Sequence, residues 1–298
     1  MAFIRYAPDP TDAGFAAEFH RVAAAATRLD GYAPFNEQAL FDATSGQRTS
    51  FLVEDADTVV GAGILGAGEL DLVVDPARRR LGHGAAALAA VLADTSGELS
   101  LWSHGDHPAA RVLAARFGLT ADRTLLQLRR DLTVPARAGT RSDTPADASA
   151  DVRIEGFRPG QDDAEWVALN ALVFAAHPEQ GALTESDLAD RRAEPWFRAG
   201  DFLIARDAGT GRMVGYNWLK IEDDSPVGEI YVIGVHPDAA GRGLGRRLML
   251  AGLHRLCERG CRTADLYVEA DSAAAVTLYR SLGFLDRTVD VQYRRGAR

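Results

Sequence analysis

The residues of this chain best suited to chemistry follow a short β-branched apolar run at positions 230–235. Pro237 ends that run, and a turn containing Gly241, Gly243 and Gly245 leads into a helical pattern over 246–258. Such a strand–turn–helix directs several unpaired backbone N–H groups, and the positive end of a helix dipole, at one place. We therefore expect this turn to bind a pyrophosphate.

Two nucleotide-binding patterns do not fit this turn. Arg246 and Leu248 stand where the third glycine of G-x-G-x-x-G would be, and no Gly-Lys-Ser/Thr follows for a P-loop. The turn instead resembles the acetyl-CoA loop of the GNAT superfamily of N-acetyltransferases, whose pattern is Gln/Arg-x-x-Gly-x-Gly/Ala after a strand. Ala240 departs from the first position, but the backbone amides that would bind phosphate are retained. A glycine-rich turn without a ligand is the alternative. The resemblance implies acetyl-CoA contacts from Ile233, Gly234, Val235, Ala240, Gly241, Arg242, Gly243, Leu244, Gly245 and Arg246.

A second pattern, further along the chain, strengthens the resemblance. The family carries Asn-x-x-Ala-x-x-x-Tyr-x-x-x-Gly-Phe, and here only the asparagine is changed, to Ser272. Asp271 or Ser272 is suited to cap the helix, and Gly283 is suited to end it. The resemblance implies that Tyr279 lies close to the sulfur of acetyl-CoA, and it adds contacts from Ser272, Ala275 and Thr277.

Both patterns recur in the N-terminal half, offset by about 160 residues, which indicates a domain duplication. The first copy has an intact loop pattern, but Ala114 occupies the tyrosine position. We therefore expect it to be catalytically poor and to act as a scaffold; a second active centre is the alternative. Its loop could still bind acetyl-CoA through Leu72, Val73, Val74, Arg79, Arg80, Gly82, His83 and Gly84.

The strand before the glycine turn differs between the copies by one residue. Glu229 precedes Pro237 by eight positions, whereas Glu69 precedes Pro76 by seven. An extra residue in a strand is a β-bulge, and bulges are common beside active sites. We expect the bulge at Gly234, and in the GNAT family such a bulge separates two strands around the pantetheine arm.

Composition is consistent with two soluble domains. The chain has 298 residues, 47% of them apolar, enough for two cores. We expect domains at 1–132 and 152–298, joined by a flexible linker at 133–151 that is rich in small and polar residues. Neither a membrane-spanning run nor a signal sequence is recognisable, and the formal charge of −9 disfavours nucleic acid and anionic membranes as partners.

The two cysteines, Cys257 and Cys261, have no partner spacing for a zinc site. We interpret them as packing or surface residues of a cytoplasmic protein without a metal. We also expect a monomer.

The order of elements predicts the fold class. The second half predicts a strand at 152–157, helices at 162–176 and 184–192, and strands at 201–207 and 213–221 before the glycine turn. Thr184 with Asp187 three residues later favours a capped helix start. We expect an α/β fold: two tandem GNAT-type domains, each a mixed, mostly antiparallel sheet flanked by helices, with a bulge in the C-terminal copy.

Acetyl transfer to an amine needs a base for the amine, a donor for the oxyanion and an acid for the departing thiolate. Glu229 is the candidate base, with a solvated strand-end glutamate as the alternative. Tyr279 is the candidate acid, with a buried core tyrosine as the alternative. The backbone N–H near Val235, released from strand pairing by the bulge, is the candidate oxyanion donor.

Segments 176–181, 191–197 and 215–220, together with the Glu229 strand, resemble a narrower family, the mycothiol synthases. These tandem acetyltransferases transfer acetyl from acetyl-CoA to the cysteinyl amine of cysteinyl-glucosaminyl-inositol, the last step in making mycothiol. The resemblance implies substrate contacts from Glu37, Glu179, Lys220, Glu229 and Tyr267; His177 is a possible second base or a structural residue. Acetylation of another small amine, such as an aminoglycoside or amino sugar, and non-enzymatic acyl-CoA sensing are the alternatives.

Overall fold

The computed structural model describes residues 3–7, 12–133, 151–175 and 180–296. Most of the expected linker at 133–151 therefore lies outside the described residues. The chain divides into two compact units. Unit 1 comprises Met1–Leu126, Glu269–Asp271 and Arg287–Arg298, and unit 2 comprises Gln127–Val268 and Ser272–Asp286.

This division differs from the contiguous ranges 1–132 and 152–298 expected from the sequence. The strand β6 (Thr120–Asp131) begins in unit 1 but ends in unit 2, and β12 (Leu285–Arg295) begins in unit 2 but ends in unit 1. In unit 1, β12 pairs with β5 from Val291 opposite Ser103 to Arg295 opposite Leu99. Each half of the sequence therefore supplies the end of one strand to the unit formed by the other half.

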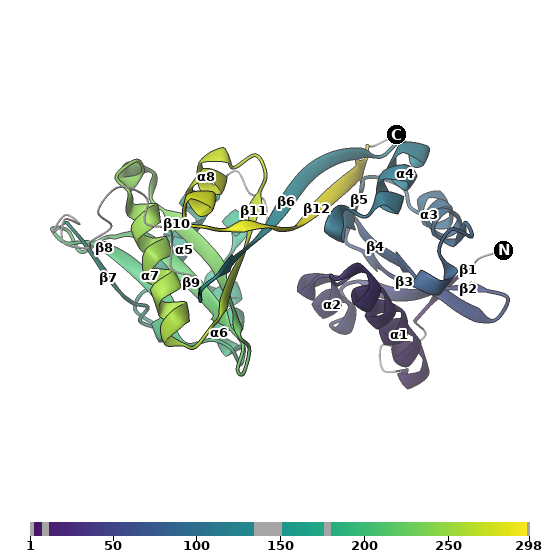
Figure 1. The fold of residues 1–298 in the computed structure, drawn as a ribbon, viewed down its shortest axis with the longest axis horizontal. Coiled ribbons are helices and arrows are strands. Elements are labelled where there is room, and N and C mark those ends of the chain that lie inside the picture. Colours follow the sequence, from purple (N-terminus) through teal and green to yellow (C-terminus); the bar gives the residue numbers. More distant parts are fainter. Residues whose placement is uncertain (1–2, 8–11, 134–150, 176–179, 297–298) are drawn as a thin grey trace. The chain divides into compact units, whose positions relative to one another are not determined.

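Unit 1 is a mixed sheet with helices on both faces (Figure 1). Its strand order is β1-β2-β3-β4-β5-β12, with β4 and β5 parallel and the other registered neighbours antiparallel. Alternation along β2 places Leu52 in the core under α1 and α2, and Phe51 and Val53 in the core under α3 and α4. Its other elements are β1 (Phe3–Tyr6), α1 (Ala13–Asp30), α2 (Glu37–Thr44), β2 (Thr49–Asp55), β3 (Thr58–Gly66), β4 (Glu69–Val74), α3 (His83–Asp94), β5 (Leu99–Ser103) and α4 (Pro108–Phe117).

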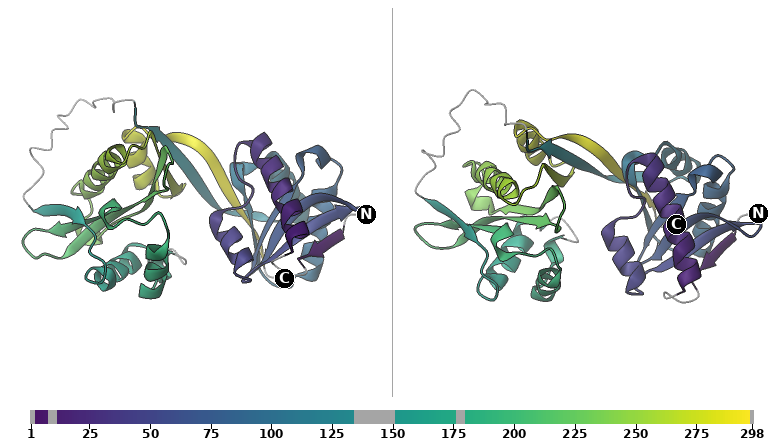
Figure 2. Two further views of the ribbon diagram at one scale, coloured as in Figure 1. Left: turned by 90° about the horizontal axis from the view of Figure 1, so that it is seen from below. Right: turned by 60° about the horizontal axis from the view of Figure 1, so that its bottom comes forward.

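Unit 2 repeats this architecture with the strand order β6-β11-β10-β9-β8-β7. Of the strand pairs whose register is described in this unit, β10 and β11 run parallel. The pairs β7–β8, β8–β9 and β9–β10 run antiparallel. Figure 2 shows α7 on one face of the sheet and α5 and α6 on the other. The elements are β7 (Val152–Gly156), α5 (Asp163–Val173), α6 (Glu185–Ala193), β8 (Phe202–Asp207), β9 (Met213–Ile221), β10 (Val227–Val235), α7 (Leu244–Glu258), β11 (Thr263–Glu269) and α8 (Ala273–Ser281). The predicted capping box of α6, Thr184 with Asp187, is present.

An aromatic core holds the α5 and α6 face of unit 2 together. Trp218 of β9 stacks on Phe202 of β8 with ring centroids 4.4 Å apart, and Trp166 of α5 meets Trp218 edge to face at 5.7 Å. These three side chains are fully buried. Large buried aromatic rings contribute strongly to stability, so this core fixes β9 as a rigid support for the strand beside it.

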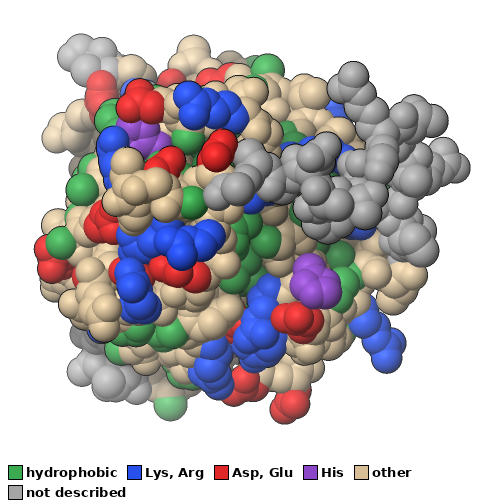
Figure 3. Space-filling view, turned by 90° about the vertical axis from the view of Figure 1, so that its left-hand side faces the viewer, with side chains coloured by type: hydrophobic (Ala, Val, Ile, Leu, Met, Phe, Trp, Pro, Cys, Tyr) green, Lys and Arg blue, Asp and Glu red, His purple; other side chains and the backbone are tan. Residues whose placement is uncertain are grey.

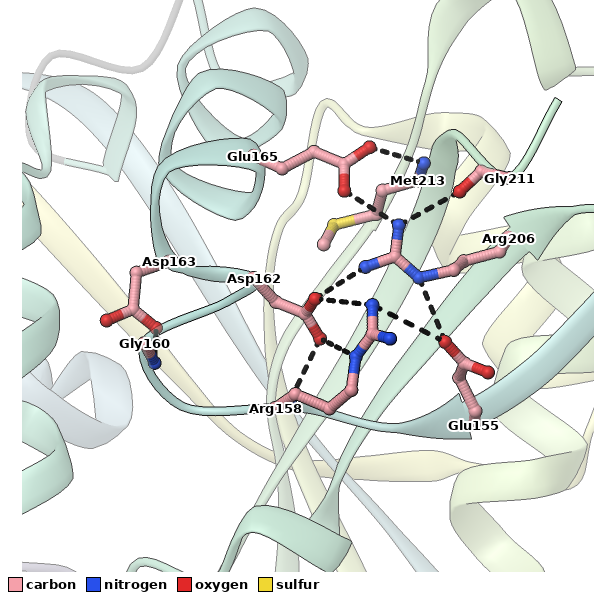
Figure 4. Close-up of polar contacts among 9 residues, drawn as sticks. All are labelled: Glu155, Arg158, Gly160, Asp162, Asp163, Glu165, Arg206, Gly211 and Met213. Carbon is pink, nitrogen blue, oxygen red and sulfur yellow. Dashed lines mark hydrogen bonds and ion pairs between the residues drawn. The ribbon is translucent and has the colours of Figure 1, made fainter.

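An ionic network with Arg206 and the buried Asp162 at its centre joins β7, α5 and β8 (Figure 4). The Arg206 guanidinium donates to Glu155 at 2.9 Å, Asp162 at 2.7 Å and Glu165 at 2.7 Å. Arg158 also donates to Asp162, at 2.8 Å. Because the Asp162 carboxylate is buried, it depends on these two cations for compensation.

The sequence prediction of a bulge in the second copy is confirmed, but its predicted position is wrong. The β9–β10 register shifts between Ile230 and Val232, so Tyr231 is the extra residue, and Gly234 pairs regularly with Tyr216. A Cβ at Gly234 would lie 2.6 Å from the Tyr216 ring. Gly234 is therefore required for close packing rather than for the bulge. In unit 1, β3 and β4 pair from Gly61 opposite Val74 to Gly66 opposite Glu69 without a shift, as expected.

Candidate active site

The strands β10 and β11 separate beside the bulge. Their parallel register runs from Val227 with Thr263 to Ile230 with Leu266, although the strands continue to Val235 and Glu269. The separation thus begins at the bulge and leaves an opening in the sheet of the kind expected for the pantetheine arm.

The backbone at the end of β10 faces this opening. The His236 N–H donates to the Val214 carbonyl of β9 at 2.9 Å. Successive N–H groups of a strand point to opposite edges, so the Val235 N–H points away from β9 and toward the β11 side. This direction suits the oxyanion donor expected from the sequence.

The glycine turn after β10 has the backbone that the loop pattern requires. Gly241 and Gly243 have φ of 75° and 76°, in the left-handed region that disfavours other residues. Gly243 is the N-cap of α7 and has no side chain to cap it, so the first-turn amides of Leu244, Gly245 and Arg246 point into a common space. Such a helix start suits an anionic pyrophosphate.

Tyr279 lies on α8 with 7% of its surface exposed, and its ring packs near Phe284 at 6.1 Å between centroids. Burial raises the pKa of Tyr279 to about 12. The phenol is therefore protonated at neutral pH and can donate a proton. Ser272 is the N-cap of the same helix, Ala275 is half-buried and Thr277 is exposed.

Four neighbouring strands of unit 2 carry charged side chains in one row, which we call the charged row. Glu229 of β10 is directly opposite Lys220 of β9 and beside Asp265 of β11, and Asp265 accepts two hydrogen bonds from Arg129 of β6. Residues paired in register project from the same face of a sheet. Tyr267 is 46% exposed and accepts a hydrogen bond from Gln127 at 3.0 Å.

Lys220 is held at one end of the charged row. Its Nζ lies 5.7 Å from the centroid of the Trp196 ring and 3.6 Å from the Glu222 carboxylate, and its side chain is only 10% exposed. The structure thus brings together the predicted residues Glu229, Lys220 and Tyr267 on adjacent strands. Glu179 and His177 lie outside the described residues, and Glu37 is the exposed first residue of α2 in unit 1.

Charges on the face of unit 2 shown in Figure 3 are mixed in sign. Lys and Arg side chains lie there beside Asp and Glu side chains (Figure 3). Among the described residues, no group of three or more His, Cys, Asp or Glu side chains is placed to hold a metal ion. Within the same residues, no helix has the length and apolarity needed to cross a membrane.

Unit 1 contains a cavity of about 660 Å³ at its own glycine loop. The eight residues predicted to bind acetyl-CoA in this half, Leu72, Val73, Val74, Arg79, Arg80, Gly82, His83 and Gly84, all line it. The Arg79 guanidinium is bound by both oxygens of Asp30 at 2.7 Å, so the backbone rather than this side chain is available to a phosphate. The buried Ala114 occupies the position of Tyr279.

Sequence analysis missed a second polar group at this cavity. His104, which lines it, has its Nδ1 3.0 Å from an Asp290 oxygen. The two residues are separated by 186 positions, and no local pattern connects them. Arg129 and Asp265 of the charged row were missed for the same reason, since they meet only when β6 pairs beside β11.

Comparison with known proteins agrees with this geometry. Residues 166–284 match the model of the acetyltransferase (GNAT) family. A mycothiol acetyltransferase of Clavibacter michiganensis subsp. michiganensis is 50% identical over 89% of this chain and 87% of its own. The mycothiol acetyltransferase of Thermobispora bispora is 46% identical over 92% of this chain and 94% of its own.

The chain belongs to the mycothiol acetyltransferase family. This membership confirms the resemblance found in the sequence and makes the protein an acetyl-CoA-dependent N-acetyltransferase. A tandem GNAT protein from the clavulanic acid biosynthesis pathway has the same fold, with a TM-score of 0.73, 19% identity, and coverage of 100% of this chain and 99% of that one. The α/β fold with two tandem GNAT-type domains is thereby confirmed.

Proposed function

We propose that this member of the mycothiol acetyltransferase family transfers acetyl from acetyl-CoA to the cysteinyl amine of cysteinyl-glucosaminyl-inositol, and that the chemistry takes place in unit 2. The relatives named mycothiol acetyltransferase support the substrate. The placement of the chemistry in unit 2 rests on one observation. Strand β10 separates from β11 after Ile230, between Glu229 and the glycine turn.

The proposed reaction uses three groups of unit 2. Glu229 accepts a proton from the amine, and the nitrogen attacks the thioester carbonyl while the Val235 N–H donates to its oxygen. The tetrahedral intermediate collapses to the amide, and the C–S bond breaks. Tyr279, protonated because its pKa is about 12, donates to the departing CoA sulfur and is reprotonated from solvent. Lys220 and Tyr267 hold sugar and inositol oxygens.

We propose that unit 1 binds acetyl-CoA as a structural ligand and does not turn it over. The cavity at its loop supports binding, and Ala114 in place of a tyrosine supports the absence of turnover. We further propose that the protein acts as a monomer in the cytoplasm without nucleic acid partners. Its two cysteines, both free, and its net charge of −9 support this view.

Acetyl-CoA consumption with cysteinyl-glucosaminyl-inositol, measured against a panel of aminoglycosides and amino sugars, tests the function. We expect turnover of the cysteinyl glycoside to exceed turnover of every other amine. Turnover of an amino sugar with none of the cysteinyl glycoside would assign the protein a different acceptor. Absence of turnover with every amine, at full acetyl-CoA binding, would favour an acyl-CoA sensor.

A further inference from the structure

The ion pair at one end of the charged row is short and bidentate, and its carboxylate is buried. Arg129 Nε lies 2.5 Å from one oxygen of Asp265, and its Nη2 lies 2.6 Å from the other. Asp265 is 5% exposed. The hydrogen bonds to Asp265 raise the pKa of Arg129, so the cation is permanent. Two parallel hydrogen bonds of this kind hold the Asp265 carboxylate in one orientation and compensate its charge.

The partner of this arginine is the neighbour of the candidate base. The parallel register places Asp265 directly beside Glu229, and the antiparallel register places Lys220 on the other side of Glu229. Across the four strands the order of charges is therefore cation, carboxylate, carboxylate, cation. Two adjacent carboxylates disfavour each other's ionised form unless a cation neutralises one of them.

We propose that Arg129 is a positioning residue for the catalytic centre of unit 2: by neutralising Asp265 it keeps Glu229 ionised and ready to accept the proton of the acceptor amine. The inference rests on the proposed function of Glu229 as base. In this role Arg129 acts on Glu229 through Asp265. It also lies before residue 133, so the N-terminal half of the sequence completes the centre formed by the C-terminal half.

Other charged or titratable groups on this side of the sheet have contacts of their own. Lys220 is paired with Glu222, the Tyr267 hydroxyl is bonded by Gln127, and the hydroxyl of the bulge residue Tyr231 accepts from Arg191 of α6 at 3.2 Å. None of these contacts involves Asp265. Arg129 is the cation that binds Asp265, the carboxylate beside Glu229.

The test is the dependence of kcat/KM for the acceptor on pH, measured on the full chain for Arg129→Gln, Arg129→Lys, Asp265→Asn and the double variant Arg129→Gln/Asp265→Asn. Arg129→Gln should move the acidic limb to higher pH by about one unit, the low end of the effect of a neighbouring charge. Arg129→Lys should restore most of the wild-type position. The double variant should also return the limb toward wild type, because the uncompensated carboxylate is gone.

Arg123→Gln is the matched control. Arg123 pairs with Glu269 at 2.6 Å through the same two strands, but Glu269 is not a register neighbour of Glu229. This variant should leave the acidic limb unmoved. A purely structural role of Arg129 would lower the rate at every pH without moving the limb, and the double variant would then be no better than the single ones; that result would overturn the inference.

Glu229→Gln separates this inference from the proposed function. If Glu229→Gln removes the acidic limb but Arg129→Gln leaves it in place, only the role of Arg129 is rejected. If Glu229→Gln leaves the limb in place, Glu229 is not the base, and the inference about Arg129 is rejected with it. Should Arg129→Gln fail to fold, Asp265→Asn carries the test, because it leaves the Arg129 cation without its carboxylate: a limb displaced to lower pH supports the inference, and an unmoved limb contradicts it.

Discussion

Glu229 and Lys220 stand directly opposite each other on β10 and β9, so a carboxylate and an ammonium project from the same face of the sheet. Lys220 is the single lysine of a chain whose other basic side chains, apart from histidine, are arginines. Its side chain is nearly enclosed, between Trp196 and Glu222. A compact, strongly hydrated ammonium differs from a planar guanidinium in both size and hydrogen-bond geometry.

Replacing Lys220 should weaken binding of the acceptor. Lys220→Gln should raise the KM for the acceptor about tenfold, the loss expected for one hydrogen bond to a charged group. The KM for acetyl-CoA should stay within about twofold, since the expected acetyl-CoA contacts lie elsewhere. Lys220→Arg should not restore acceptor binding, because the larger guanidinium does not fit the enclosed position. An unchanged acceptor KM in Lys220→Gln would place the sugar and inositol oxygens elsewhere.

Removing the hydroxyl of Tyr279 should impair chemistry and leave binding intact. Tyr279→Phe should lower kcat by about a hundredfold or more, the low end of general-acid contributions. Affinity for acetyl-CoA, measured by calorimetry, should change little. Tyr293→Phe, which removes a hydroxyl from β12 in unit 1, is the control and should retain wild-type kcat. Wild-type turnover in Tyr279→Phe would make this tyrosine a packing residue.

The same tyrosine should make stability fall at alkaline pH. Its pKa is about 12 in the folded protein and about 10 in an unfolded chain, so unfolding releases a proton between these values and stability falls as pH rises through them. At pH 11 the loss relative to pH 8 should be about 1 kcal/mol for this group. Urea unfolding at both pH values should show a smaller loss for Tyr279→Phe than for the wild type. Equal losses would mean that the phenol is not buried.

The two glycine loops offer a matched pair of substitutions. Gly243 and Gly82 both have left-handed φ, and a Cβ on either would meet no atom within 4 Å. Valine at each should therefore cost a similar stability, about 1–2 kcal/mol from backbone strain. Gly243→Val should abolish turnover, because backbone approach to the pyrophosphate is blocked in unit 2. Gly82→Val should keep most turnover per folded molecule, so its effect should be seen in stability and in loss of any acetyl-CoA bound to unit 1.

Equal abolition by both valine variants, with circular dichroism showing both folded, would contradict the assignment of chemistry to unit 2 alone. Calorimetric stoichiometry distinguishes the remaining cases. Two acetyl-CoA molecules per wild-type chain and one per Gly82→Val chain is the expected result.

The ionic network of β7, α5 and β8 predicts a stability difference between two arginines. Arg206→Ala should destabilise the protein by about 3 kcal/mol, because it removes one partner of a buried carboxylate. Arg158→Ala should cost about 1 kcal/mol or less, because half of its side chain is exposed to solvent. Denaturant unfolding measures both. Equal costs would show that Asp162 does not depend on Arg206.

The sequence by itself determined the local features of this protein. The glycine turn, the capped start of α6 and the spacing from Tyr279 to Phe284 are all set within a few residues, because caps and left-handed turns depend on residues close in the chain. The family and the tandem fold followed from these motifs and their repetition. The strand before Pro237 has one residue more than the matching strand before Pro76, and this difference predicted a bulge.

Only the tertiary structure decided where long-range pairing puts each residue. The bulge falls at Tyr231 rather than Gly234, because its position is set by the register with β9 and by the packing of Gly234 on Tyr216. Strands β6 and β12 each end in the unit formed largely by the other half of the sequence, and this pairing brings Arg129 to Asp265, 136 positions away. No local pattern encodes such contacts, since their free energy arises only when both strands are in place.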